Sequence, residues 1–290
     1  MIRLYGARAG GRGSCRSCAS ASPIPPVRVT FLGTGTSTGV PVIGCGCGVC
    51  TSADPRDRRL RTSALVEANG LTVVIDTGPD FRAQALRAGL TRVDAVLFTH
   101  HHYDHVAGLD DVRPFLFDNK RPVPCYAAPE TAAALRRVYP YAWGGDAYPG
   151  VPVLSLCEIA APFDAPFDVP GRYPDTADAR LSVLPVPAWH GAAAILGFRI
   201  GRMAYLTDVS ALPDASRALL DGLDVLVLGA LRPEPHPMHL SLSQAVALAG
   251  EIGARQTYFV HMAHQVQHAR TRFPDGIALA HDGLTVNVEG

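Results

Sequence analysis

Short apolar runs alternate with longer amphipathic segments from position 27 to the end of the chain. A short β-prone run bounded by turn residues is typical of a strand, whereas an apolar period near 3.6 residues over a longer segment is typical of a helix. The strands we expect are 27–32, two strands within 64–75 around a turn at Asn69-Gly70, 93–98, 123–127, 181–184, 195–200, 203–206, 225–228, 256–260 and 284–288. The helices we expect are 81–88, 129–138, 214–221 and 243–252, the last preceded by a capping box of Ser241 and Gln244.

Both halves of the chain mix strands with helices, which predicts an α/β fold of two packed mixed sheets with helices outside. In this interpretation residues 27–290 form one folded domain. Residues 1–26 are rich in Gly, Ser, Ala, Arg and Pro and predict a disordered arm. Residues 139–178 are rich in Pro, Tyr, Phe and Gly with little periodicity, so we expect an insertion or lid there.

The composition is that of a globular protein, with 48% hydrophobic and 18% charged residues among 290. The formal net charge is zero, so the chain has no overall field to attract nucleic acid or a membrane surface. No apolar run is long enough to span a bilayer, and the N-terminal segment lacks the apolar centre of a secretory signal. We therefore expect a cytoplasmic protein, in which grouped thiols bind metal more often than they form disulfides.

Histidines and a carboxylate crowd into a polar segment directly after the expected strand 93–98. The residues concerned are His100, His102, Asp104 and His105. Imidazoles and carboxylates are ligands for divalent metals such as zinc, manganese and iron. A solvated polar loop is the other interpretation, but the H-x-H-x-D-H spacing after an apolar strand favours a metal site. His101 is left over, and we expect it to point away.

Three further candidate ligands follow strands in the second half of the chain. They are His190, Asp208 and His261. A single histidine in such a place is more often structural, but three such placements beside the H-x-H-x-D-H segment favour ligands. The seven residues then divide between two divalent cations that Asp208 bridges. The first cation takes His100, His102 and His190, and the second takes Asp104, His105 and His261.

Three cysteines within six positions, separated by glycines, indicate a second metal site. They are Cys45, Cys47 and Cys50, and His264, three residues beyond His261, is the candidate fourth ligand of a tetrahedral zinc. The alternative is a set of free cysteines.

The other cysteines give weaker signals. Cys125 and Cys157 stand beside apolar residues, so we expect them to pack in the core. Cys15 and Cys18, in the arm, have no partner pair and carry no prediction.

Several residues have two interpretations on the sequence alone. Asp76, at a strand end, either orients a metal-bound histidine or caps the next turn. One histidine ahead of the helix 243–252 is a candidate general acid, and we favour His239 over His236, which lies between prolines. The glycine-rich segment 33–37 is either a tight turn under the site or a phosphate loop.

The arginine-rich run 56–61 is typical of a solvated loop. A weaker hypothesis is that one of its arginines meets an anionic substrate.

Taken together, these residues resemble the metallo-β-lactamase fold superfamily. H-x-H-x-D-H at 100–105, followed by His190, Asp208 and His261, is similar to its dinuclear ligand pattern. Three narrower features resemble the phosphoribosyl 1,2-cyclic phosphate phosphodiesterases of the carbon–phosphorus lyase pathway. They are G-T-G-T-S-x-G-V-P at 33–41, C-x-C-x-x-C at 45–50 and H-x-x-H at 261–264. The resemblance covers 27–290 and implies a four-layer αβ/βα sandwich.

The resemblance implies a hydrolase with two active-site cations (zinc, manganese or iron) and one structural zinc held by the cysteines and His264. The two cations would activate a shared water for attack on a small cyclic phosphodiester such as phosphoribosyl 1,2-cyclic phosphate. His239 would protonate the leaving group, and Asp104 and Asp208 would complete the catalytic set. We expect a small-molecule phosphodiester as partner, no membrane and no nucleic acid, and leave a homodimer open.

Other activities of the same fold are alternatives. An ester, lactone or thioester hydrolase would use the same activated water, and proteins of pyrroloquinoline quinone biosynthesis share a similar cysteine knuckle. A tRNA 3′-processing nuclease would need a basic arm or patch, which a chain of zero net charge without a Lys/Arg-rich insertion does not offer. A non-catalytic metal-binding module usually goes with lost ligands, and no ligand is missing here.

Overall fold

The computed structural model describes residues 26–117, 121–143 and 154–289. The strands are β1 (Val27–Gly33), β2 (Ser63–Ala68), β3 (Leu71–Ile75), β4 (Ala95–Leu97), β5 (Val123–Ala127), β6 (Leu154–Glu158), β7 (Phe167–Pro170), β8 (Arg180–His190), β9 (Ala193–Ile200), β10 (Met203–Leu206), β11 (Val225–Gly229), β12 (Gln256–Val260), β13 (Ile277–Leu279) and β14 (Thr285–Val288). The α-helices are α1 (Phe81–Arg87), α2 (Tyr103–Val106), α3 (Pro129–Val138), α4 (Asp214–Ala218) and α5 (Leu242–Ile252). Short 3-10 helices are η1 (Pro55–Asp57), η2 (Leu109–Leu116) and η3 (Pro174–Thr176).

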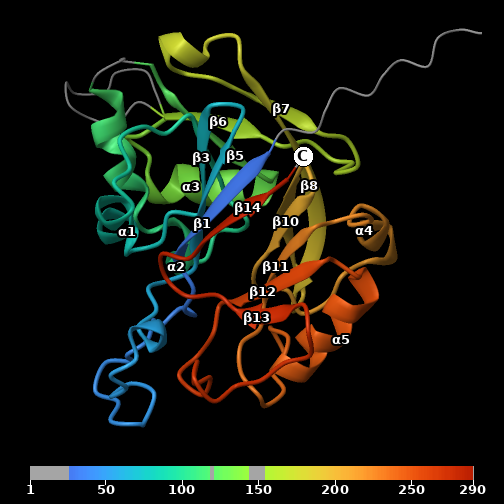
Figure 1. Ribbon diagram of the computed structural model, residues 1–290. Helices are drawn as coiled ribbons and strands as arrows, with labels where there is room; N and C mark the ends of the chain where they lie inside the picture. The colour runs from blue at the N-terminus through green and yellow to red at the C-terminus, as the bar shows by residue number, and fades with distance from the viewer. Residues whose placement is uncertain (1–25, 118–120, 144–153, 290) are drawn as a thin grey trace, which may run out of the picture.

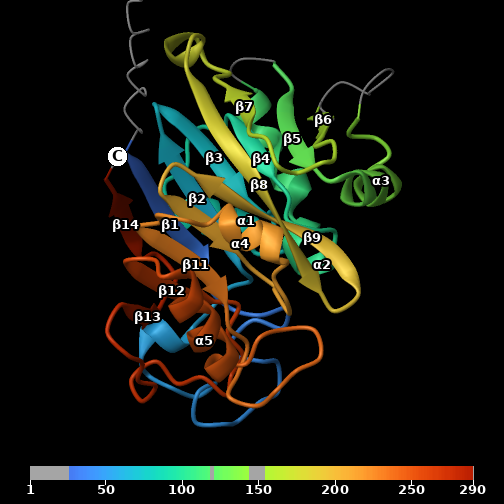
Figure 2. The same cartoon turned by 90° about the vertical axis from the view of Figure 1, so that its right-hand side faces the viewer.

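The strands form two seven-stranded mixed sheets that pack face to face. The first has the order β14-β1-β2-β3-β4-β5-β6, and the second β13-β12-β11-β10-β9-β8-β7. The helices α1 and α3 lie outside the first sheet, and α4 and α5 lie outside the second (Figures 1 and 2). The predicted fold class, two packed mixed sheets with helices outside, is therefore confirmed.

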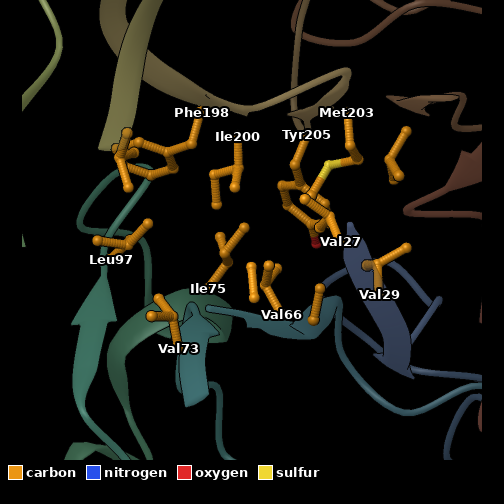
Figure 3. Packing of buried hydrophobic residues seen from close by; sticks show 14 of the residues in the cluster. Val27, Val29, Val66, Val73, Ile75, Leu97, Phe198, Ile200, Met203 and Tyr205 are labelled. Carbon is orange, nitrogen blue, oxygen red and sulfur yellow. The ribbon is translucent and has the colours of Figure 1, made fainter. Parts of the chain in front are cut away.

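The main core fills the space between the two sheets. Val29, Ile75 and Leu97 from the first sheet face Phe198 and Tyr205 from the second (Figure 3), and each is 0% exposed. Two further apolar clusters lie under the helices, one beneath α1 and α3 and one beneath α5. Alternate residues of the central strands therefore serve two cores, which explains why β11 is almost entirely apolar and why every residue of β3 is buried.

Most of the predicted elements are present. Strands β5, β10 and β12 and helix α3 have the predicted bounds, and the capping box of Ser241 and Gln244 begins α5. Gly253, in the left-handed conformation, ends that helix.

Three predictions about elements were wrong. In the described parts of the segment 139–178, namely 139–143 and 154–178, regular structure is present, because β6 extends the first sheet beside β5 and β7 extends the second beside β8. Strand β13, only three residues long, was missed. The segment that carries the histidines is not a loop throughout, because Asp104 and His105 lie on α2.

Among the described residues, no helix is both long and apolar enough to cross a membrane. Residues 1–25 of the predicted arm, including Cys15 and Cys18, lie outside the described residues. Cys125 is fully buried as predicted, whereas Cys157 is only partly buried and does not belong to the core.

Candidate metal centre

All seven predicted active-site ligands come together where strands end. His100 and His102 follow β4, Asp104 and His105 lie within α2, His190 ends β8, Asp208 follows β10 and His261 follows β12. The ligand atoms of His100, His102 and His190 lie within 4.8 Å of one another, as do those of Asp104, His105, Asp208 and His261. This division matches the one that we predicted from sequence.

Asp208 lies between the two groups. Its Oδ1 is 3.4 Å from His105 Nε2, and its Oδ2 is 3.2 Å from His261 Nε2. The same Oδ2 is 3.9 Å from His100 Nε2, in the other group. The carboxylate is therefore placed to bridge two cations.

Three of the ring nitrogens that face away from the centre are held by the protein, whereas Nδ1 of His261 is buried without a hydrogen-bond partner in the described part of the chain. His105 Nδ1 lies 2.7 Å from Asp76 Oδ2, and His190 Nδ1 lies 2.8 Å from the Met238 carbonyl oxygen. His100 Nδ1 lies 3.0 Å from Thr99 Oγ1. The opposite atoms, Nε2 of His100 and His105, are buried and have no hydrogen-bond partner in the described part of the chain. Buried polar atoms are normally paired, so these two fit ligands of a metal ion.

The electrostatics of the centre also fit cation binding. Burial alone would raise the pKa of Asp208, but His261 and His105 beside it hold that pKa well below its usual value. Burial would lower the pKa of His105, but Asp208 and Asp76 raise it well above the usual value. The carboxylates therefore stabilise positive charge at His105 Nε2, and a divalent metal ion can bind this nitrogen in place of the proton.

The backbone at this centre is strained. Asp76, Asp208 and His261 have φ of 61°, 58° and 59°, a left-handed conformation that non-glycine residues seldom adopt. Each costs about 1–2 kcal/mol, and such strain concentrates at functional sites. No pattern in the amino-acid sequence predicts this conformation at the three residues.

Of the two interpretations of Asp76, the structure supports the orienting one. Asp76 Oδ1 accepts a hydrogen bond from the Thr99 backbone N–H at 2.8 Å, and Oδ2 accepts one from Thr99 Oγ1 at 2.8 Å. With the contact to His105, the carboxylate fixes both the end of β4 and the imidazole ring. The helix that follows, α1, has Asp80 rather than Asp76 at its N-cap.

His239 lies at the mouth of the centre. Its Nδ1 is 3.8 Å from Asp208 Oδ2, and its ring centroid is 4.6 Å from that of His190 and 4.9 Å from that of His261. Burial, together with the neighbouring His261, lowers the pKa of His239 to about 3. Because His239 also lies within ligand distance of His190 and Asp208, it is close enough to contact a substrate bound there.

His236 and His101 lie farther out. His236 Nδ1 accepts a hydrogen bond from the Met238 backbone N–H at 3.2 Å, so it supports the turn that holds His190. His101 belongs to neither ligand group, whereas His102 is the exposed member of its group and marks the open side of the centre.

The cysteine cluster has its predicted fourth member. His264 Nδ1 lies 3.3, 3.6 and 3.5 Å from the Sγ atoms of Cys45, Cys47 and Cys50. A tetrahedral zinc with ordinary Zn–S and Zn–N bonds would separate sulfur from nitrogen by about 3.6 Å. The backbone N–H of Cys50 lowers the pKa of Cys47 to about 6, which favours the thiolate that binds metal. The four residues therefore fit a structural zinc.

The arginine-rich run is only in part the solvated loop that we expected, because Arg56 and Arg58 are exposed whereas Arg59 is buried and Arg61 is partly buried. Arg59 is 1% exposed and pairs with Asp57, and Arg61 pairs with Asp80 at 3.1 Å. The 33–37 segment is packed closely against this run, because a Cβ on Gly33 would lie 1.9 Å from the Arg61 carbonyl oxygen. Glycine is needed there for close approach of two backbones.

Comparisons with known proteins agree with this architecture. A family model described as the β-lactamase superfamily domain matches residues 72–262. A crystal structure described as a new diphosphatase from the PhnP family is 43% identical, has a TM-score of 0.81 and covers 91% of this chain and 98% of its own. Zinc-bound PqqB from Methylobacterium extorquens is 20% identical with a TM-score of 0.67, covers 89% of this chain and 99% of its own, and shares the fold.

A relative with a different name is also similar. The octanoyltransferase of Porphyromonas gingivalis is 38% identical over 268 residues, which are 91% of this chain but 52% of the relative. The chain thus spans about half the length of that protein. The family model spans most of the folded region, and the two packed sheets have the same architecture as the PhnP-family structure. The chain therefore belongs to the β-lactamase superfamily, with the metallo-β-lactamase fold and close to the PhnP branch.

Proposed function

We propose that this protein is a dinuclear metal-dependent phosphodiesterase that hydrolyses a small, cyclic phosphodiester such as phosphoribosyl 1,2-cyclic phosphate. The observation that carries the proposal is the pair of ligand groups with Asp208 between them, all seven predicted ligands being present and His239 lying beside them. The 43% identical structure, described as a diphosphatase of the PhnP family, covers 91% of this chain and supports hydrolysis at a phosphoryl group. The octanoyltransferase name belongs to a protein about twice as long and does not decide the activity.

The residues divide the work in the following way. Six ligands and the bridging Asp208 would hold two divalent cations, either zinc, manganese or iron, which lower the pKa of water and neutralise charge on phosphoryl oxygens. Asp104 and Asp208 stay ionised because neighbouring histidines lower their pKa against the effect of burial. His239 delivers a proton to the departing alkoxide. An anionic phosphoryl group beside His239 raises its pKa from the low value that burial imposes.

The open side of the centre fits a small substrate. His102 is exposed and His239 is 15% exposed, while His100, His105 and His261 are buried beneath them. A substrate approaching from this side meets the His100–His102–His190 group and His239 together. A cyclic phosphodiester needs no long binding groove, so a site of this kind is sufficient for it.

The test is hydrolysis of bis(p-nitrophenyl) phosphate, a 2′,3′-cyclic nucleotide and the cyclic ribose phosphate by purified protein whose metal content is measured. We expect turnover that depends on manganese, zinc or iron and that His239→Ala reduces while metal content is unchanged. His101→Ala is the matched control, because His101 lies outside both ligand groups. Metal-loaded protein that hydrolyses esters, lactones or thioesters but no phosphodiester would overturn the proposal.

A further inference from the structure

Arg59 is one of the largest completely buried side chains of the protein. It lies between the cysteine cluster and β2, and its Nη2 donates to Asp57 Oδ1 at 3.0 Å. The guanidinium also donates to two backbone carbonyl oxygens, from Nη1 to Ala263 at 3.3 Å and from Nη2 to Val266 at 2.8 Å. Burying a charge is unfavourable even when it is paired, so a guanidinium at this place needs a reason beyond packing.

Those two carbonyls belong to the segment that carries one ligand of each metal site. His261 belongs to the dinuclear group and His264 to the cysteine cluster, and only two residues separate them. Ala263 and Val266 lie on either side of His264, so Arg59 holds this segment on both flanks of that ligand. The two metal sites thus share one short piece of backbone.

Asp57 strengthens the same arrangement. It is 1% exposed, and its Oδ1 accepts both from Arg59 and from the His268 backbone N–H at 2.8 Å. On the other side, Met262 exchanges backbone hydrogen bonds with Thr34 and Thr36 at 3.0 and 3.2 Å. The Ala263 backbone N–H also donates to the Leu231 carbonyl oxygen at 2.8 Å. The segment from His261 to His268 is therefore fixed at several points, and Arg59 supplies contacts on both sides of His264.

We propose that Arg59 is a positioning residue that fixes the 261–266 segment, so that His261 and His264 each face their own metal group, and that it couples the cysteine cluster to the metal affinity of the dinuclear centre. The proposal rests on the metal centres of the proposed function. A planar guanidinium holds its donors in a fixed fork. Nη1 can therefore donate to the Ala263 carbonyl while Nη2 donates to Asp57 and to the Val266 carbonyl. A lysine ammonium at this position cannot reach both carbonyls in the same geometry.

The test compares Arg59→Lys and Arg59→Met with wild type after replacing bound metal with cobalt. Thiolate-to-cobalt charge-transfer absorption reports the cysteine cluster, and d–d absorption that changes without a change in that charge-transfer band reports the His/Asp groups, while a competing chelator is titrated. We expect Arg59→Met to weaken cobalt affinity at the His/Asp groups by about 10–100-fold, the usual effect of removing support from a metal ligand. The cobalt affinity of the Arg59→Lys variant at these groups should lie between that of wild type and that of Arg59→Met.

Arg56→Met is the matched control. Arg56 is in the same run but exposed, and its guanidinium donates hydrogen bonds to Asp54. The cobalt affinity of the Arg56→Met variant should therefore equal that of wild type. Folding is checked by thermal melting. If Arg59→Met does not fold, the lysine variant keeps the charge and supplies the measurement.

A double-mutant cycle separates coupling from general stability. Cys47→Ser should lower the cobalt affinity of the His/Asp groups in the wild-type background. In the Arg59→Met background it should lower that affinity little further, because both changes release the same segment. Additive effects, or folded Arg59 variants with wild-type affinity at both sites, would overturn the proposal. Wild type that binds no cobalt at the His/Asp groups would instead overturn the proposed function.

Discussion

Asp76 and His105 form a completely buried carboxylate–imidazole pair, with Oδ2 of the aspartate 2.7 Å from Nδ1 of the histidine. The contact fixes the orientation of the ring and leaves Nε2 facing Asp104 and Asp208, at 3.3 and 3.4 Å. Asp76 adopts its left-handed conformation, at φ 61°, in order to reach this position. The strain at Asp76 is therefore offset by its contacts with His105 and Thr99.

Asp76→Asn should weaken metal binding at the Asp104–His105–Asp208–His261 group by about 10–100-fold, because an amide accepts only on its oxygen and cannot support both Thr99 and His105. Metal affinity measured by chelator competition checks this. Asp80→Asn is the control, since Asp80 bonds Arg61 and no histidine. Equal affinities in the two variants would contradict the orienting role of Asp76.

Asp208→Ala should remove measurable hydrolysis while leaving the cysteine cluster loaded. Without its carboxylate, nothing bridges the two ligand groups, and His105 and His261 keep only Asp104 of the two carboxylates beside them. The measured metal content should fall from about three ions per chain to about one, and the cysteines hold the ion that remains. Retention of all three ions would show that Asp208 does not bridge.

Cys47→Ala should act first on stability rather than on catalysis. A structural zinc contributes its binding free energy to folding, so its loss lowers the melting temperature and the yield of soluble protein. Thermal melting with and without chelator measures this effect. If this variant and Asp208→Ala changed activity and melting in the same way, the division into a structural site and a catalytic site would be wrong.

Strand β8 shows where the apolar pattern stops being informative. The pattern predicts only 181–184, because Pro185 and Pro187 follow and proline cannot donate to a ladder. In the structure β8 continues to His190, although its neighbour β7 pairs only as far as Val183. The Trp189 N–H lies on the same edge of β8 as the nitrogens of the two prolines. It donates a hydrogen bond to the Ala211 carbonyl oxygen at 2.9 Å and not to β9. The prolines therefore occupy an open side of the strand, and sequence does not show where a neighbouring strand ends.

The ligands could be predicted because their spacing is a property of the sequence, whereas the groups that orient them could not. His190 is held by the Met238 carbonyl, a backbone atom 48 residues away that carries no side-chain signal. Arg59 sits in a run whose charge density is typical of a solvated loop, yet its side chain is buried under the histidine segment. Both contacts depend on how distant loops meet, which only the folded chain determines.

Gly78 packs directly against the backbone of α2, so Gly78→Ala should lower both stability and metal affinity. A Cβ at this position would lie 2.1 Å from the Asp104 carbonyl oxygen, a backbone atom that cannot rotate away. Thr77, the preceding residue, already bonds the His105 carbonyl through its N–H at 2.8 Å. Relief of the clash must therefore move the helix that carries Asp104 and His105. Overpacking of this kind typically costs about 1–3 kcal/mol.

Gly250→Ala is the matched control for this last prediction. Gly250 lies within α5, where a Cβ would meet nothing within 4 Å, and its φ is not in the left-handed region. Alanine there should stabilise the protein by about 0.5–1 kcal/mol and leave metal affinity unchanged. Denaturant unfolding and chelator competition on both variants separate the two effects. If Gly78→Ala lowered stability but bound metal like wild type, α2 would tolerate displacement, and the tight contact between residues 77–78 and α2 would serve the fold rather than the metal centre.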